Sequence, residues 1–333
     1  MKVGIIGSGF GLYGLLPAFN AVPDVKVTAI CGKKSERLLS YCESIGLTKI
    51  YSDWEEMLEK EQLDAIAIAV IPSAQYAIVK VAIKKGIHIF AEKPLTAKYE
   101  EAKELLTLAT KKRITTMVDF IFPEIEEWER AKELLDTKVY GELKHISVHW
   151  DFLSYDIKNK IASWKTDAKE GGGALSFYGS HTLHYLEYFG GPVKSIASTF
   201  TYSKESKNGA ETGVDMVVTF KNKITGQVHV SCNTVGLTQH KLVFFCEKGT
   251  LILESESGVT EHFTLTACTE TKKKSIAVKK MKNKKNEDER VRTVKKLATR
   301  FIQGAKNGTR VTPSFKDGAR VQELIEKIRK SEL

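Results

Sequence analysis

The chain has 333 residues, of which 42% are hydrophobic and 28% are charged. These proportions are typical of globular proteins and exclude a wholly disordered or collagen-like chain. The length exceeds that of one ordinary domain, so we expect two domains. The longest clear apolar run, 65–71, is much shorter than the roughly 20 residues that cross a bilayer, so we expect no membrane partner.

Two further features predict a cytoplasmic protein. The apolar part of the N-terminal segment is too short for a signal-peptide core, and it runs directly into a glycine-rich turn. The five cysteines include no Cys-x-x-Cys pair, which argues against a disulfide framework or a cysteine-built zinc site.

The net charge of +10 comes from one segment. Residues 271–300 contain 13 Lys or Arg and three acidic residues, so they carry the whole excess. We interpret the lysine-rich part, 272–285, as a solvated hairpin or loop, with attraction to an anionic partner as the alternative. A nucleic-acid-binding protein usually spreads its basic residues over a shaped surface, so we expect no nucleic-acid partner.

Short strands and helices alternate through the first third of the chain. Buried strands are predicted at 2–6, 25–31, 50–51, 64–71, 87–91 and 115–118. Helices are predicted at 12–21, from 35 to 45, at 53–58, 74–85 and 98–112. This alternation predicts an α/β domain with a doubly wound parallel sheet over residues 1–119.

The pattern changes after residue 119. A helix is predicted at 124–136, and two more close the chain at 291–305 and 316–330. Between them, alternating segments joined by short polar turns predict antiparallel strands at 145–151, 194–202, 215–220, 227–233, 241–246, 250–253 and 263–267. Residues 120–333 therefore form the predicted second domain.

A glycine-rich turn, Gly7-Ser8-Gly9-Phe10-Gly11, lies between the first strand and the first helix. Glycine suits this place because a tight turn needs positive φ and a pyrophosphate must approach the backbone closely. The helix N-terminus then offers N–H groups and the positive end of its dipole. The third glycine comes one residue before its usual place in G-x-G-x-x-G, so the match is partial. We interpret the turn as a dinucleotide site, with a plain glycine turn as the alternative.

The end of the second strand favours one nicotinamide cofactor. An acidic side chain there binds the ribose 2′-OH, whereas a basic one tolerates a 2′-phosphate. The chain has Lys33 and Lys34 at this point, followed by Ser35, and no carboxylate at the strand tip. We therefore favour NADP(H) over NAD(H), with lysines that only solvate a loop as the alternative.

The tripeptide Glu92-Lys93-Pro94, after such an N-terminus, resembles the signature of the Gfo/Idh/MocA oxidoreductases (glucose–fructose oxidoreductase, inositol dehydrogenase and relatives). Four other segments look like the family: Gly86-x-His88-x-Phe90, Trp164 with Gly171-Gly172-Gly173 after it, Gly179-Ser180-His181, and Pro313-Ser314-Phe315 with Asp317-Gly318. The resemblance spans nearly the whole chain. It implies a Rossmann domain, and then an α/β domain with an open, mainly antiparallel sheet.

The resemblance also implies roles for both domains. The second domain would bind substrate and build oligomer contacts (a dimer or tetramer), and its C-terminal helices would pack back on the first. Pro72, Glu92 and Lys93 would lie at the cofactor, with Lys93 beside the nicotinamide and the substrate hydroxyl. His181 matches a catalytic-site histidine of the family, and histidine can exchange a proton near neutral pH.

The chain departs from the family at several of these positions. Phe177 stands where many relatives have aspartate, and His184 replaces another frequent aspartate. The segment 73–76 also lacks a histidine that relatives often carry there. Phe177 would either stack on a sugar ring, line a less polar pocket or pack in the core. Tyr178 adds a hydroxyl nearby.

Two further sets of residues have open interpretations. Trp164 and Asp167 precede the glycine run and would either form a wall of the substrate pocket or lie in a solvated loop. His181, His184 and Glu187 share a helix face, a spacing that divalent metals accept, but the family needs no metal and we expect none.

These features predict an NADP(H)-preferring oxidoreductase that acts on a sugar, a sugar derivative or a cyclitol. Lys93 would orient the substrate oxygen, and His181 would be the acid/base group, while the cofactor carries the hydride. Because an aspartate is missing at Phe177, the alternative is a catalytically divergent dinucleotide-binding sensor or regulatory protein of the same fold.

Overall fold

The computed structural model describes residues 1–204, 206, 208–281 and 285–331. They form two compact units. Unit 1 consists of Met1–Ile121 and Lys282–Gln322, and unit 2 of Phe122–Met281 and Glu323–Leu333. The prediction placed one boundary at 119/120. In the structure the units change at 121/122, and a late segment also belongs to unit 1.

Unit 1 contains a six-stranded sheet in the order β3-β2-β1-β4-β5-β6. Its strands are β1 (Lys2–Ile6), β2 (Lys26–Cys31), β3 (Ile50–Tyr51), β4 (Ala65–Ile68), β5 (His88–Ala91) and β6 (Thr116–Val118). All neighbours in the sheet are parallel, which confirms the predicted doubly wound architecture. The strand order reverses beside β1, and ligands of such sheets bind at the carboxyl ends of the strands there.

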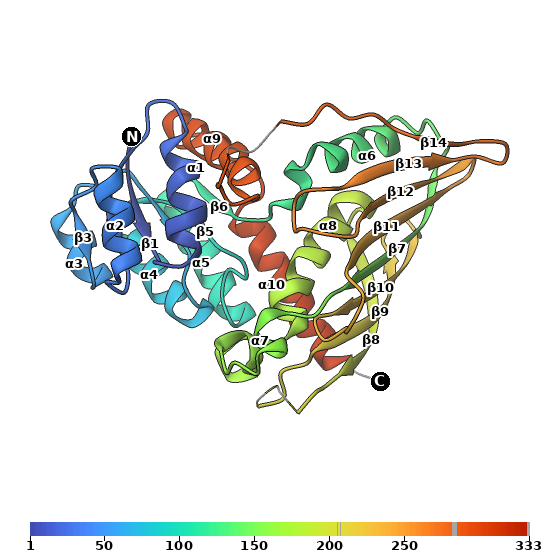
Figure 1. Ribbon diagram of the computed structural model, residues 1–333, viewed down its shortest axis with the longest axis horizontal. Helices are drawn as coiled ribbons and strands as arrows, with labels where there is room; N and C mark the ends of the chain where they lie inside the picture. Colours follow the sequence, from blue (N-terminus) through green and yellow to red (C-terminus); the bar gives the residue numbers. More distant parts are fainter. Residues whose placement is uncertain (205, 207, 282–284, 332–333) are drawn as a thin grey trace. The chain divides into compact units, whose positions relative to one another are not determined.

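Helices follow the strands of unit 1 in alternation (Figure 1). They are η1 (Gly11–Leu15, a π-helical turn), α1 (Leu16–Asn20), α2 (Glu36–Ser44), α3 (Trp54–Lys60), α4 (Pro72–Lys85) and α5 (Tyr99–Lys112). The predicted strand 64–71 is longer than β4 because Ile71 already caps α4, which begins at Pro72. Proline suits the first helical position because its missing N–H is not needed there.

The late helix α9 (Val291–Asn307) completes the core of unit 1. It lies beside α1, as Figure 1 shows. The ring of Phe301 on α9 contacts those of Phe19 and Phe90, with centroids 6.2 and 5.9 Å apart. All three rings are fully buried. The last helix, α10 (Phe315–Lys330), begins in unit 1 and ends in unit 2.

Unit 2 contains an eight-stranded sheet in the order β14-β13-β12-β11-β7-β10-β9-β8. Its strands are β7 (Leu143–Asp151), β8 (Val193–Thr201), β9 (Gly213–Phe220), β10 (Thr225–Ser231), β11 (Gln239–Cys246), β12 (Gly249–Ser255), β13 (Thr264–Cys268) and β14 (Lys273–Ser275). The neighbours are antiparallel except β7 and β10, which are parallel. The prediction of a mainly antiparallel sheet is confirmed.

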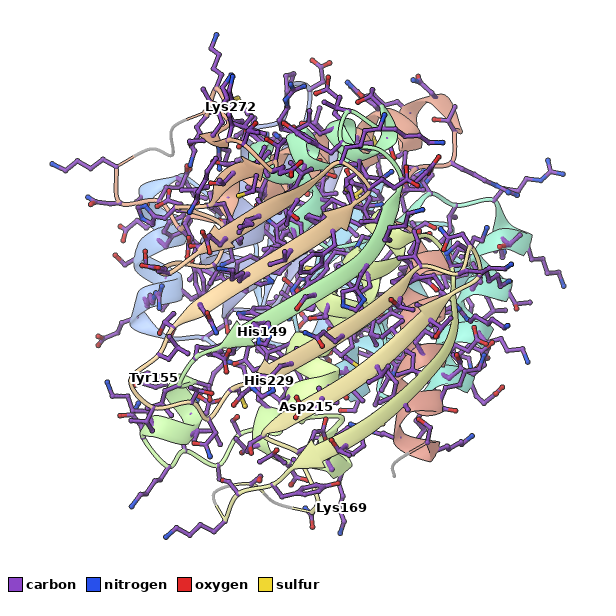
Figure 2. The ribbon with its side chains drawn as sticks, turned by 90° about the vertical axis from the view of Figure 1, so that its right-hand side faces the viewer. His149, Tyr155, Lys169, Asp215, His229 and Lys272 are labelled. Atoms are coloured by element: carbon purple, nitrogen blue, oxygen red, sulfur yellow. The ribbon has the colours of Figure 1, made fainter. Side chains whose placement is uncertain are left out.

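Helices α6 (Glu126–Asp136) and α8 (Ser180–Gly190) pack on one face of this sheet. Phe189 of α8 contacts Phe244 of β11, with 4.6 Å between ring centroids. The shorter helical turns of unit 2 are η2 (Phe122–Glu124), α7 (Tyr155–Lys158), η3 (Trp164–Thr166), η4 (Ala168–Glu170) and η5 (Leu175–Gly179). The opposite face carries polar side chains, and Figure 2 shows His149, His229 and Asp215 on it.

The lysine-rich segment begins as an edge hairpin. β14 pairs with β13, and its three side chains are exposed. The interpretation as a solvated hairpin also covered residues 282–284, which lie outside the described part of the chain. In the described part, no helix is both long and apolar enough to span a bilayer.

Candidate active site

The glycine-rich turn leaves room for a bound group directly over its backbone. Gly7 has a φ of 123°, and a Cβ there would lie 2.1 Å from the carbonyl oxygen of Ala69, so only glycine fits. At Gly9 the opposite holds, because a Cβ would meet no atom within 4 Å. A helical run begins here at Gly11, and no side chain caps it. The N-terminus of a helix is a favourable place for an anion, because its N–H groups and its dipole both attract negative charge. The turn therefore fits the diphosphate of a dinucleotide.

The end of β2 lies against this turn. The main-chain N–H of Gly7 donates to the carbonyl of Cys31 over 2.7 Å, and a Cβ on Gly32 would lie 2.6 Å from that of Ser8. The next two residues, Lys33 and Lys34, are exposed at the strand tip. The predicted basic residues therefore directly follow Gly32, which contacts the glycine-rich turn.

Other charges also surround the tip of β2. Ser35 caps α2 by accepting a hydrogen bond from the N–H of Leu38. Arg37, which the sequence analysis did not select, lies with its guanidinium carbon 5.3 Å from the ring centroid of Tyr13. Asp53 adds a negative charge near the same strand end. Burial, and then the charges of Asp53 and Glu56, raise the pKa of Cys31 to about 11. The tip therefore carries both signs of charge.

The segment Glu92-Lys93-Pro94 is held by a buried amide. Gln75, on the first turn of α4, is 1% exposed, and its Nε2 donates to the carbonyls of Glu92, Pro94 and Leu95 over 2.7, 3.2 and 3.0 Å. The Lys93–Pro94 peptide bond is cis. Glu92 in turn accepts the N–H of Lys93 with its Oε2, at 2.9 Å. The main chain of Lys93 is thus fixed from both sides.

A buried aspartate lies beside this segment. Asp119 follows β6, is 2% exposed, and donates its main-chain N–H to the carbonyl of Ala91 over 2.9 Å. Burial, and then the charge and hydrogen bonding of Glu92, raise the pKa of the Asp119 carboxyl well above its ordinary range. The positive charges of Arg290 and Lys93 act in the opposite direction. Asp119 therefore holds its proton more tightly than an exposed aspartate does, and a second acid, Glu92, lies next to it.

His181 lies in an aromatic cluster of unit 2. It is on the first turn of α8, is 6% exposed, and its ring centroid is 4.9 Å from that of Phe122. His240 of β11 contacts the same phenyl ring from 4.9 Å and stacks on Trp150 at 4.3 Å. Burial lowers the pKa of His240 to about 3, so its ring is neutral, and it hydrogen-bonds the hydroxyl of Tyr185 at 3.0 Å. The two predicted catalytic residues thus belong to different units, Lys93 to unit 1 and His181 to unit 2.

The structure brings three predicted substrate residues together. The ring of Phe177 contacts those of Trp164 and Tyr178, with centroids 5.3 and 4.6 Å apart. The ammonium of Lys165 lies 4.8 Å from the Phe177 ring. Burial raises the pKa of the Tyr178 hydroxyl, so it is a neutral donor. Together they form a partly exposed aromatic surface with one cation on it.

Asp167 has local partners in this region. Its Oδ1 accepts the N–H of Lys169 at 2.9 Å and the amide of Asn208 at 2.8 Å. Glu187, on α8, accepts the N–H of Val193 at 2.8 Å. Within the described ranges, no three His, Cys, Asp or Glu side chains are placed to hold a metal ion.

Four residues at these sites were not among those that the sequence analysis selected. Gln75, Asp119, His240 and Arg290 are single polar residues outside the motifs, and only the fold gives them their neighbours. For Gln75 the sequence offers one signal, because the segment 73–76 lacks a histidine that relatives often carry there.

Comparison with known proteins identifies both units. Residues 1–120 match a family model described as the oxidoreductase family with an NAD-binding Rossmann fold. Residues 128–252 match the GFO/IDH/MocA C-terminal domain. The two matches together cover more than half of the chain and confirm the resemblance that the motifs predicted.

Individual relatives agree with these matches. An uncharacterized oxidoreductase of Synechocystis sp. is 30% identical over 268 residues, which are 77% of this chain and 72% of the relative. D-xylose 1-dehydrogenase (NADP(+)) 2 of Haloferax volcanii is 25% identical over 236 residues, 70% of each chain. Among solved structures, levoglucosan dehydrogenase in complex with NADH and levoglucosan has a TM-score of 0.87 at 19% identity and covers 99% of this chain and 96% of its own. At that identity the likeness shows the fold alone.

Proposed function

Because the chain belongs to the Gfo/Idh/MocA family of NAD-binding oxidoreductases, we propose that it transfers a hydride to or from a carbinol or carbonyl carbon of a sugar, a sugar derivative or a cyclitol. The observation that carries the proposal is the Lys93 segment, which Gln75 fixes at the carboxyl end of β5 in a sheet built for a dinucleotide. The names of the xylose and levoglucosan dehydrogenases support a sugar-like substrate.

Each side chain has a distinct part in this proposal. The nicotinamide, when bound, supplies or accepts the hydride. Lys93 donates a hydrogen bond to the substrate oxygen and polarises its bond to carbon. His181 exchanges the proton of that oxygen. Trp164, Phe177 and Tyr178 offer the apolar face on which a sugar ring stacks, while Lys165 supplies a donor at its edge.

The cofactor in this proposal is NADP(H), with NAD(H) as the alternative. Lys33 and Lys34 support NADP(H), because they are exposed and follow the end of β2, where a basic residue tolerates a 2′-phosphate. Asp53 argues for the alternative, because its carboxylate acts on the same strand end. A fluorescence titration with NADPH and NADH decides between them. Preference for NADH would remove NADP(H) from the proposal without changing the rest.

The decisive experiment changes Lys93 to Met, which keeps the aliphatic stem and removes the ammonium. We expect turnover with the preferred sugar to fall by about 100-fold or more, while the affinity for the reduced cofactor stays within about twofold. Lys98→Met is the matched control, because it removes an exposed lysine a few residues away. Unchanged turnover in Lys93→Met would overturn the proposal.

A cofactor-binding sensor is the second candidate function. Phe177 supports it, because a phenyl ring packed against Trp164 cannot accept the proton that an aspartate would take there. A panel of sugars and cyclitols, assayed by nicotinamide absorbance with each cofactor, separates the two candidates. Turnover on any of them rejects the sensor, whereas cofactor binding without turnover supports it.

We also propose that the protein is a dimer or tetramer. The face of the unit 2 sheet that carries Asp215 and His229 (Figure 2) supports this. Val217, two residues after Asp215 on β9, lies on the same face and is 65% exposed. Light scattering should give a molar mass that is two or four times the 37.2 kDa of one chain. Val217→Glu should shift the mass toward the monomer. A monomeric wild-type protein would contradict the proposal.

A further inference from the structure

Arg290 lies against the glycine-rich turn although 279 positions separate it from Gly11 in the sequence. It precedes α9 in unit 1, and its guanidinium carbon is 4.3 Å from the ring centroid of Phe10. The same carbon is 5.8 Å from the ring centroid of Tyr13. Phe10 stands between Gly9 and Gly11, so the cation lies on the side chain of a residue of the glycine-rich turn.

Asp288 holds the guanidinium in one orientation. Its two carboxylate oxygens accept from Nε and Nη2 of Arg290, both at 2.8 Å, and one of them also accepts the main-chain N–H of Arg290 at 3.0 Å. Guanidinium has five N–H donors in a planar fork, and this pair uses two of them. In the part of the chain that the structure describes, no acceptor is bonded to the other three.

The charge of Arg290 also reaches the Lys93 segment. It opposes the rise in the pKa of Asp119 that burial and Glu92 cause. Burial lowers the pKa of Arg290 itself, but Asp288 and, to a smaller extent, Tyr13 and Glu92 more than offset this. The guanidinium therefore contacts side chains at the glycine-rich turn and interacts through its charge with the segment at the end of β5. A diphosphate links the same two regions in a bound dinucleotide, because it joins the adenosine half to the nicotinamide half.

We propose that Arg290 binds the cofactor diphosphate, as a side-chain clamp opposite the N–H groups of the glycine turn. Asp288 fixes the plane of the guanidinium, and the edge away from Asp288 supplies two or more charge-assisted hydrogen bonds to phosphate oxygens. The inference rests on the cofactor site proposed above. It competes with a purely structural role, in which Arg290 only packs on Phe10 and ties α9 to the turn.

The test measures binding rather than turnover. ADP-ribose, which carries the diphosphate and lacks the nicotinamide, is titrated calorimetrically into the wild-type chain, Arg290→Gln and Arg290→Lys. AMP, which has a single phosphate, is titrated in parallel. Lys295→Gln is the control, because it removes one exposed positive charge from α9. Thermal unfolding without ligand shows whether each variant is folded.

We expect Arg290→Gln to weaken ADP-ribose binding by about 10-fold or more and to weaken AMP binding less. The salt dependence of ADP-ribose binding should also decrease, because one cation no longer pairs with phosphate. Arg290→Lys should lose affinity to an intermediate degree, since it keeps the charge and loses the fork. If Arg290→Gln does not fold, the intermediate loss in Arg290→Lys supports the inference, and unchanged affinity there overturns it.

Two outcomes would overturn the inference in different ways. If wild-type protein binds ADP-ribose and Arg290→Gln binds it equally well, the clamp is wrong and the cofactor site stands. If Arg290→Gln weakens the binding of ADP-ribose and AMP equally, the clamp is also wrong. Arg290 then has a packing role through Phe10. If the wild-type protein binds neither ADP-ribose nor a nicotinamide cofactor, the cofactor site itself is wrong.

Discussion

The side-chain amide of Gln75 donates a 2.7 Å hydrogen bond to the main-chain carbonyl of Glu92, the residue that precedes Lys93. Two longer bonds from the same nitrogen reach the carbonyls of Pro94 and Leu95. A buried carbonyl without a partner costs about 1–3 kcal/mol. The two hydrogens of this amide are shared among three carbonyls that would otherwise destabilise the segment. The position of the proposed catalytic lysine thus depends on a residue that takes no part in proton transfer.

Gln75→Ala should therefore reduce both stability and turnover. We expect a loss of about 1–3 kcal/mol in the free energy of unfolding by urea, because the three carbonyls lose their donor. Turnover should fall while cofactor affinity changes less, since the glycine turn is untouched. Gln227→Ala is the control, because that side chain is exposed on β10 and its amide donates to the hydroxyl of Ser147 at 3.2 Å. Equal effects of the two variants would show that Gln75 does not position Lys93.

Asp119 should make the protein less stable as the pH rises. A raised pKa in the folded state means that the folded chain holds a proton that the unfolded chain has released. Its contribution is complete below the unfolded pKa of about 4 and is lost as the pH rises through the folded value. Asp119→Asn keeps a donor toward Glu92 and cannot ionise.

Asp119→Asn should accordingly gain stability relative to the wild type on going from about pH 5 to about pH 9, by roughly 1 kcal/mol or more. Urea unfolding at several pH values measures this difference. Glu59→Gln, an exposed acid on α3, should show no such trend. Parallel curves for Asp119→Asn and wild type would mean that Asp119 is ionised in the folded protein.

His240 should produce the opposite dependence. Burial lowers its pKa to about 3, so the unfolded chain takes up a proton below about pH 6.5 that the folded chain refuses. Stability from this residue is present above the unfolded pKa and falls by about 1.4 kcal/mol per pH unit as the medium becomes more acidic. His240→Gln should flatten the acid side of the stability curve, whatever its effect at neutral pH. His262→Gln, a histidine with a side chain 66% exposed, should leave the slope unchanged.

His229 on the open sheet face should behave in yet another way. Burial lowers its pKa, but Asp215 at 2.7 Å and Asp151 at 3.1 Å more than offset this, so the pKa is raised. This contribution is complete below about pH 6.5 and is lost as the pH rises through the folded value. Because the ring is one-third exposed, solvent screens the pair and we expect less than about 1 kcal/mol.

Asp215→Asn tests this on β9. The variant should be less stable than the wild type at about pH 5.5 and equal to it at about pH 9, where His229 is neutral in both. Differential scanning calorimetry at the two pH values measures the change. A difference that persists at the higher pH would mean that Asp215 stabilises the sheet in a way unrelated to His229.

The local pattern of the sequence predicted most of the elements. On β9 the residues Val214, Met216, Val218 and Phe220 are buried and Asp215 and Val217 are exposed, which is the alternation that predicted a strand. The glycine turn was equally visible, because its constraint is local to the backbone. The parallel pairing of β7 and β10 was not visible, since alternation is the same for either direction.

The residues that the sequence did not reveal acquire their surroundings from long-range pairing. His240 stacks on Trp150 because the register of β11 and β7 sets them opposite one another. Asp119 meets Glu92 because β6 and β5 end side by side. No period in the sequence encodes such neighbours, so only the fold can identify them.

The position of α9 has a consequence for biosynthesis. Phe301 closes the cluster around Phe19 and Phe90, so unit 1 lacks part of its core until the ribosome has made the segment that includes it. The first residues to emerge are thus among the last to be fully covered, and a fragment that stops at Ile121 would expose those rings to water. Chaperones and proteases therefore meet an unfinished nucleotide-binding half for most of the time that translation takes.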